Sequence, residues 1–101
     1  MEEKKNTQKQ EENVFISLAK RYIDDNIEMA PSVEEVSKYC YLSTKQLTRI
    51  FQRHEDISPG EYIKNRRISK IEKLLADDSF SLKQISETMN FNNEYYLSAF
   101  S

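Results

Sequence analysis

Glycine, proline, cysteine and tryptophan are scarce or absent: the 101 residues include one Gly, two Pro, one Cys and no Trp. A sheet protein would need more turn residues and more strict alternation, so this scarcity favours an all-α fold with short connections. One Cys excludes an internal disulfide, and one Cys with one His cannot build a zinc site alone. We therefore expect an intracellular protein without cofactor or metal.

Long apolar runs are also missing. No stretch approaches the length of a membrane span, and no signal peptide pattern opens the chain. No nucleophile is paired with a base, and no pocket of carboxylates is indicated, so we expect a non-enzyme. The length suits one domain, and any effector-sensing domain would lie outside this chain. We expect no membrane contact and no small molecule bound by this chain.

Serines mark four expected helix starts, since each is followed three residues later by Glu or Gln, the pattern of a capping box. The four pairs are Ser32 with Glu35, Ser43 with Gln46, Ser58 with Glu61, and Ser81 with Gln84. The first two starts lie so close together that only a turn fits between their helices. Residues 32–53 are therefore predicted to form two short helices joined by a tight turn.

This helix pair is repeated later in the chain. The repeat is visible when Ser32, Val36 and Cys40 are set against Ser81, Ile85 and Met89, and Leu47 against Leu97. Residues 14–57 are thus predicted to form a first helix-turn-helix subdomain, with an additional helix from about Val14 to Asn26, and residues 77–101 a second. Residues 58–76 would form one linker helix, roughly 25 Å long at the rise of an ideal helix.

Residues 1–13 contain no apolar residue after Met1. Such a segment has nothing to contribute to a core, so we expect a disordered arm or a solvated helical extension. Two single residues receive similarly plain interpretations. Cys40 lies on an apolar helix face and is predicted to be a buried small hydrophobe, and His54 is predicted to lie at a solvated helix end.

The second helix of residues 32–53 has two different faces. Leu47, Ile50 and Phe51 form an apolar face at helical spacing. The opposite face carries Lys45, Thr48, Arg49 and Gln52. Such donors suit guanine and phosphate in a major groove, although a merely solvated face is an equally good interpretation of one isolated helix.

The distribution of charge favours the nucleic-acid interpretation. The chain has a net charge of -2, but residues 43–73 hold eight basic and four acidic residues. The acidic residues gather in 1–35 and in 77–101. A DNA footprint needs a basic face and not a basic chain, so the local excess is compatible with DNA binding.

The chain resembles the DNA-binding domain of the AraC/XylS family of bacterial transcription regulators. The resemblance rests on residues 32–53, on S-P-G-E-Y-I-x-x-x-R-I-x-x-I-x-x-L-L at 58–75 and on F-N-N-E-Y-Y-L-S at 91–98. It implies two recognition helices in successive major grooves, about one helical turn or roughly 34 Å apart. It also implies a cytoplasmic bacterial regulator, most often an activator, with promoter DNA and RNA polymerase as partners.

The resemblance assigns roles to individual residues. Base contacts in the first unit are implied for Lys45, Gln46, Thr48, Arg49 and Gln52. Phosphate contacts are implied for Ser43, Thr44, Arg53 and Arg66. The matching face of the second recognition helix carries Asn93, Glu94, Tyr95 and Ser98.

Several positions depart from the family pattern. Tyr41 and Asn90 stand in the turns where the family commonly has Gly; Asn tolerates a left-handed conformation, but Tyr adopts it at a cost. Ala99 replaces a usual Arg, and Glu94 would face a polyanion. The second helix is therefore expected to be the weaker reader. The family's last helix would follow Ser101.

An alternative function comes from a different class: a helical module that binds RNA polymerase or another regulator. Weak reading by the second unit and the acidic flanks are compatible with it. The surface distinguishes the two hypotheses, because DNA binding requires that Lys45, Arg49, Arg53 and Arg66 share one face.

Overall fold

The computed structural model describes residues 2–90, and every regular element among them is a helix. The elements are α1 (Glu2–Asp25), the short 3-10 helix η1 (Ile27–Met29), α2 (Val33–Tyr39), α3 (Thr44–Glu55), α4 (Pro59–Ala76) and α5 (Leu82–Thr88). The predicted all-α fold is confirmed. None of the helices within residues 2–90 is both long and apolar enough to cross a membrane.

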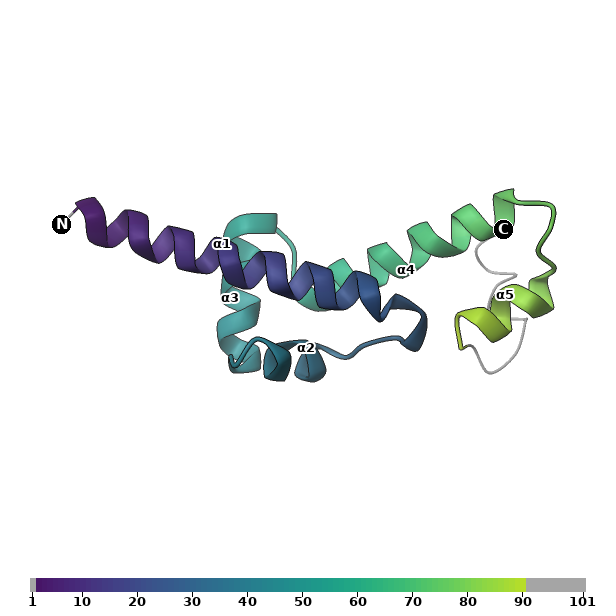
Figure 1. Cartoon of the computed structure of the whole chain (residues 1–101), viewed down its shortest axis with the longest axis horizontal. Coiled ribbons are helices and arrows are strands. Elements are labelled where there is room, and N and C mark those ends of the chain that lie inside the picture. The colour runs from purple at the N-terminus through teal and green to yellow at the C-terminus, as the bar shows by residue number, and fades with distance from the viewer. Residues whose placement is uncertain (1, 91–101) are drawn as a thin grey trace.

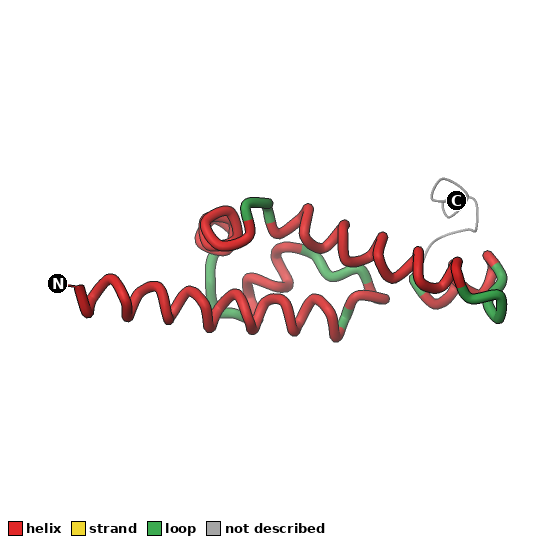
Figure 2. The backbone as a smooth tube through the Cα atoms, turned by 90° about the horizontal axis from the view of Figure 1, so that it is seen from above, coloured by secondary structure: helices red, strands yellow, loops and turns green. Residues whose placement is uncertain are grey.

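The molecule is elongated, with principal extents of 56 × 22 × 19 Å. α1 and α4 run in the same direction along the long axis, and α5 lies at the far end of α4 (Figure 1). α3 is seen end-on when the molecule is viewed from above, so it crosses the long helices steeply (Figure 2). This arrangement places α3 near the start of α4 and α5 at the far end of α4 (Figure 1).

The main core joins α1, α2, α3 and α4. Its buried residues are Ile16, Ala19, Ile23, Ile27, Val36, Cys40, Leu47, Ile50, Phe51 and Ile63. The apolar face predicted for α3 is therefore buried, and removal of such side chains from water supplies the main favourable term in folding. Cys40 is a buried free thiol, as predicted, and burial raises its pKa.

All four predicted capping serines cap a helix. The hydroxyls of Ser32, Ser43, Ser58 and Ser81 each accept a hydrogen bond from the backbone N–H three residues later. The reciprocal bond of a full capping box forms only at Ser43 and Ser81, where the third residue is Gln. At Ser32 and Ser58 the third residue is Glu and only half of the predicted box is present.

α5 repeats α2 in length and in both caps. Each helix has seven residues, follows a capping Ser and ends at a residue with φ near -90°, namely Cys40 (-87°) and Met89 (-91°). α5 packs through Ile85 and Met89 against Ile71 of α4. Residues 91–101 lie outside the described residues, so the second recognition helix, with Asn93, Glu94, Tyr95 and Ser98, stays a prediction.

The polar N-terminal segment is helical from Glu2, in agreement with the second of its two expected forms. The expectation that it buries nothing is wrong at Glu12, whose side chain is only 13% exposed. Glu12 lies one helical turn before Ile16 and on the same side of α1 as Ala19 and Ile23. It therefore extends the buried face of α1 towards α3.

Candidate nucleic-acid interface

α3 presents one continuous polar face to the surface. Its apolar residues Leu47 and Phe51 are fully buried, which turns the opposite side of the helix outward. A shallow hollow lies on this outer side, lined by Thr44, Lys45, Thr48, Arg49 and Gln52. Four of the five residues to which we assigned base contacts are thus brought together on one surface.

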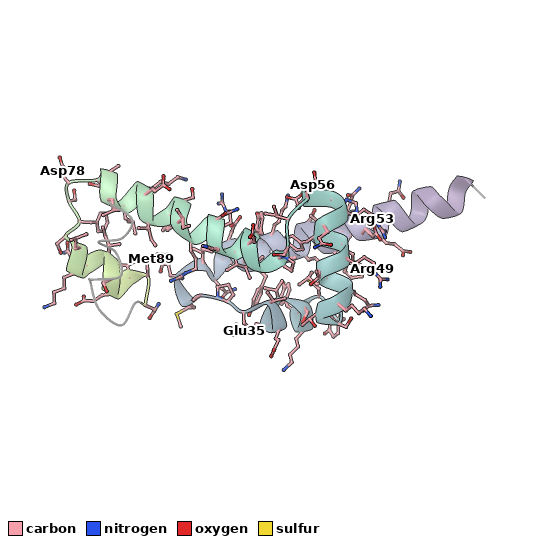
Figure 3. The ribbon with its side chains drawn as sticks, turned by 180° about the vertical axis from the view of Figure 1, so that it is seen from behind. Glu35, Arg49, Arg53, Asp56, Asp78 and Met89 are labelled. Carbon is pink, nitrogen blue, oxygen red and sulfur yellow. The ribbon has the colours of Figure 1, made fainter. Side chains whose placement is uncertain are left out.

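Lys45, Arg49 and Gln52 are exposed, and Thr48 is half-buried. The Thr48 hydroxyl donates to the Thr44 carbonyl at 2.8 Å, so its oxygen remains available as an acceptor. Arg49 and Arg53 follow one another along α3 (Figure 3). Side chains three and four apart on a helix are neighbours, so these donors form a compact group.

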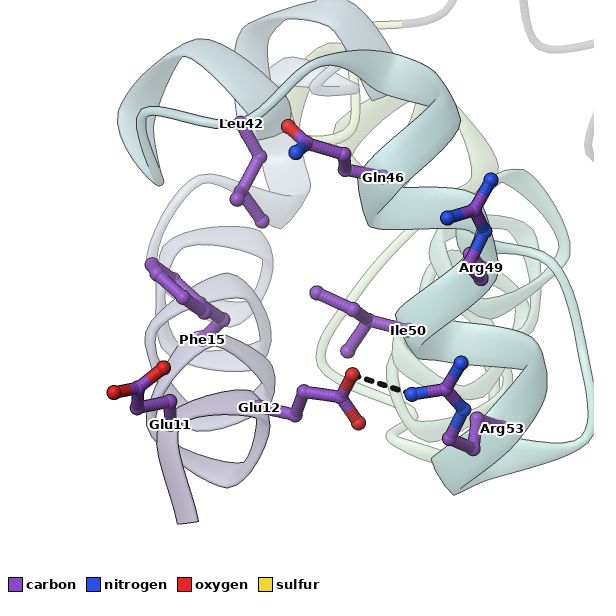
Figure 4. Close-up of a pocket in the computed structure, with 8 residues that line it drawn as sticks. All are labelled: Glu11, Glu12, Phe15, Leu42, Gln46, Arg49, Ile50 and Arg53. Atoms are coloured by element: carbon purple, nitrogen blue, oxygen red, sulfur yellow. Dashed lines mark hydrogen bonds and ion pairs between the residues drawn. The ribbon is translucent and has the colours of Figure 1, made fainter. Parts of the chain in front are cut away.

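Gln46 is the fifth residue of that prediction, and it does not line the hollow that the other four share. Its side-chain oxygen accepts from the Ser43 N–H at 3.0 Å and closes the capping box of α3. It lines a neighbouring hollow, between α1 and α3, together with Leu42 and Ile50, and Arg49 borders both hollows (Figure 4). Gln46 therefore serves first to begin α3.

Ser43 and Thr44 stand at the N-terminus of α3 and are exposed. Ser43 accepts from the Gln46 N–H at 3.1 Å and uses its hydroxyl oxygen as a cap. The first N–H groups of a helix lack partners within the helix, and the helix dipole favours an anion there. The start of α3 is thus suited to a phosphate next to the polar face.

Arg53 is already paired. Its guanidinium binds Glu12 of α1 at 2.5 Å (Figure 4). The other oxygen of Glu12 lies 2.9 Å from Nε2 of His54. The hydrogen bond with His54 is the largest influence on Glu12; burial opposes it, Arg53 adds to it, and the pKa of Glu12 is lowered. The predicted solvated helix end at His54 is wrong, because its side chain is 13% exposed and bonded.

Arg66, the other predicted phosphate contact, lies on α4. Its Nε donates to Oδ1 of Asp24 on α1 at 2.9 Å, and both side chains are 43% exposed. Arg53 is 52% exposed. Both cations are therefore balanced by carboxylates of α1 while remaining open to solvent, whereas Lys45 and Arg49 line the hollow on α3.

A second surface of the first unit, an edge formed by α1 and the end of α2, carries exposed apolar and aromatic side chains. Tyr41 is 96% exposed, and Tyr39 and Val14 are about half exposed. Tyr39 and Tyr41 border a hollow with Phe15 and Leu18. Exposed aromatic residues are enriched in protein interfaces, so this edge is the surface that best fits the alternative hypothesis of a protein partner.

Arg67 was not among the predicted site residues, yet it joins distant parts of the chain. Its guanidinium donates to the carbonyl of Ile27 in η1 and to the carbonyl of Met89 at the end of α5. Burial lowers its pKa. A sequence signal was present: Arg67 lies between Ile63 and Ile71 at the spacing of one buried helix face.

Comparison with known proteins gives one matching family model, described as a helix-turn-helix domain, over residues 36–101. This match covers more than half of the chain and includes α3 and α5. No solved structure matches the chain significantly.

Curated relatives are named as transcriptional regulators. An uncharacterized HTH-type transcriptional regulator of Bacillus subtilis, YfiF, is 29% identical over 89 residues, which cover 88% of this chain and 28% of the relative. The XylDLEGF operon transcriptional activator 3 of Pseudomonas putida is 27% identical over 66% of this chain and 20% of its own length. The HTH-type transcriptional activator Btr of Bacillus subtilis is 26% identical over 82% of this chain and 16% of its own length. The chain thus spans between a sixth and about a quarter of these relatives.

Proposed function

The chain belongs to the AraC/XylS type of helix-turn-helix transcription regulators, and we propose that it binds double-stranded DNA sequence-specifically through α3 in the major groove. The family is one of regulators and not of enzymes. The observation that supports this proposal best is the hollow on α3, where Lys45, Thr48, Arg49 and Gln52 gather around one surface. An α-helix fits the major groove, where base edges present a distinct pattern of donors and acceptors.

Arg49 is the central reader in this proposal. Its guanidinium is planar and can donate two parallel hydrogen bonds to guanine, which is worth about 1–3 kcal/mol of discrimination against another base. Lys45 and Gln52 lie one turn on either side of it, so they would reach neighbouring base pairs. The side-chain oxygen of Gln46 is used in the capping bond, so Gln46 would contact a base only through its side-chain NH2 group.

Ser43, Thr44, Arg53 and Arg66 are proposed to hold phosphates and set the register of α3. Contacts to phosphate carry no sequence information directly but fix the orientation of the protein. Glu12 and Asp24 compete with phosphate for the two arginines, because each carboxylate already occupies one guanidinium. DNA binding would therefore require Arg53 and Arg66 to share or exchange these partners.

We propose further that the regulator acts as an activator and recruits RNA polymerase. Support comes from the relatives, several of which are named transcriptional activators. The second unit, residues 77–101, would place Asn93, Glu94, Tyr95 and Ser98 in an adjacent groove. The alternative, a module that binds only protein, is favoured by the exposed Tyr39 and Tyr41 and is decided by the same experiment.

The experiment begins with selection of duplexes from random DNA by the purified chain. Arg49→Ala should relax sequence choice, whereas Arg53→Ala should weaken all sequences alike and lower the slope of log affinity against log salt by about one. Glu12→Gln should strengthen all sequences alike, because it releases Arg53. Lys64→Ala, an exposed cation on α4 without an assigned role, is the matched control for loss of charge. Equal affinity for selected and random DNA would contradict specific reading and favour the alternative.

A further inference from the structure

We propose that Arg67 and Asn90 are positioning residues: they lock α5 onto the first helix-turn-helix unit and thereby set the spacing between the two DNA sites that the chain accepts. The consequence for DNA rests on the proposed function. The lock itself is a property of the protein alone. We call the contacts of Arg67 and Asn90 with residues 27–29 and with Met89 the junction.

Arg67 forms the centre of the junction. From α4 its guanidinium donates to the Ile27 carbonyl at 2.5 Å and to the Met89 carbonyl at 3.0 Å. Ile27 belongs to η1, the short helix that directly follows α1 in the first unit. Met89 is the C-cap of α5. One planar group with fixed donor directions therefore joins both units to the linker helix.

Asn90 makes a second, independent link. Its side-chain nitrogen donates to the Glu28 carbonyl at 2.7 Å and lies 3.4 Å from the sulfur of Met29. The residue adopts φ 59°, a left-handed conformation that Asn tolerates better than most residues. The turn after α5 is thus attached directly to η1, across 62 positions of sequence.

These hydrogen bonds add what apolar packing cannot supply. Ile85 and Met89 pack against Ile71, but apolar contacts are not directional and permit α5 to shift or rotate on α4. The last carbonyls of a helix lack partners within it, and a cation near the C-terminus satisfies them. The hydrogen bond from Arg67 to the Met89 carbonyl therefore fixes the position of the end of α5, immediately before the predicted second recognition helix.

Fixed spacing matters because two linked binding modules gain affinity only when the link matches the distance between their sites. A rigid junction favours one phase of the DNA helix. A loosened junction lets the second unit bind half-sites at several separations along the DNA helix, with a lower preference for any one separation. The junction would therefore act on the choice of DNA without touching DNA.

The first test measures the lock without DNA. Spin labels at Glu34→Cys on α2 and Lys83→Cys on α5, both exposed positions, are placed in a Cys40→Ala background. We expect a narrow distance distribution that broadens with Arg67→Met, with Asn90→Asp and most with both. Arg67→Lys keeps the charge but not the planar pair of donors, and it should broaden the distribution as well. Lys64→Met removes a cation from the same helix and should leave it narrow.

Folding is controlled by far-UV circular dichroism of every variant. Should Arg67→Met fail to fold, Asn90→Asp still tests the junction, because its side chain is exposed and Asp also tolerates the left-handed conformation. An unchanged distance distribution in folded Asn90→Asp and Arg67→Lys would overturn the proposal.

The second test measures spacing. Duplexes carry the two halves of a selected site at their natural separation or shifted by about half a helical turn, together with a duplex holding the first half alone. We expect the preference for the natural spacing to fall roughly tenfold in Arg67→Lys and Asn90→Asp, with unchanged binding of the first half. An unchanged preference would overturn the role in spacing. If the original chain reads no DNA sequence, the proposed function and its spacing consequence fail, whereas the label distances still decide whether the lock exists.

Discussion

Residues 32–41 and 81–90 are two copies of one helix and turn with different tertiary surroundings. The helices α2 and α5 have the same length and the same kind of cap, and both copies end in a left-handed residue, Tyr41 with φ 58° and Asn90 with φ 59°. Tyr41 is 96% exposed, whereas the Asn90 side chain donates to the Glu28 carbonyl. The same local structure thus leaves the turn residue exposed to solvent in one copy and hydrogen-bonded to a distant segment in the other.

The comparison shows what a side chain contributes once the backbone is already determined. Both turns need a residue at positive φ, which is costly for most residues. At Asn90 this cost is offset by a bond to a distant segment, and at Tyr41 nothing comparable is seen among the described residues. Tyr41 therefore stands where stability alone would favour Gly, which fits a surface role for its ring.

The largest predicted effect concerns the buried side chain that each copy contributes to its core, measured as the loss of unfolding free energy when it is shortened to Ala. Ile85 and Val36 occupy matching positions, and both are fully buried. Ile85→Ala should lower the free energy of unfolding by about 2–5 kcal/mol. Val36→Ala should lower it less, because fewer carbon atoms leave the core. Urea unfolding followed by circular dichroism measures both; a smaller loss at Ile85 than at Val36 would mean that α5 is poorly packed on α4.

The turn residues should respond to Gly with opposite signs. Tyr41→Gly relieves a left-handed conformation that costs about 1–2 kcal/mol and loses about 0.5–1 kcal/mol to chain entropy, so unfolding should become slightly less favourable. Asn90→Gly also removes a hydrogen bond worth about 0.5–1.5 kcal/mol, so stability should fall. Thermal unfolding of the two variants side by side checks this, and a shift in the same direction would contradict the distinction between the turns.

The smallest effect is expected from Glu12, which contacts α3, the helix that follows the first copy. Its pKa is lowered in the folded chain, so its contribution is present above about pH 4.3, the ordinary value for Glu, and is lost as the pH falls through the lowered value. Glu12→Gln should reduce stability by less than about 1 kcal/mol at neutral pH. Unfolding temperatures of both chains across acidic pH should converge; a gap that widens at low pH would contradict the assignment.

Local patterns predicted most of the secondary structure of this chain. Capping serines, apolar periodicity and the repeat indicate α2, α3, α4 and α5, because these signals depend on residues within one or two helical turns. The same reasoning placed Leu47 and Phe51 in the core and Lys45 and Arg49 outside. Helix capping and amphipathicity are short-range causes, and one sequence is enough to read them.

Pairing between distant residues was decided only by the tertiary structure. Arg53 meets Glu12 across 41 positions and Arg66 meets Asp24 across 42, so two of the predicted phosphate contacts already hold carboxylates. The hydrogen bonds of Arg67 with Ile27 and of Asn90 with Glu28 span 40 and 62 positions. No local pattern specifies such contacts, because they depend on how the helices pack. The sequence by itself determined where α2 to α5 begin and which face of α3 is apolar, because caps and periodicity are local, and packing determined which cations of the described residues already hold a carboxylate.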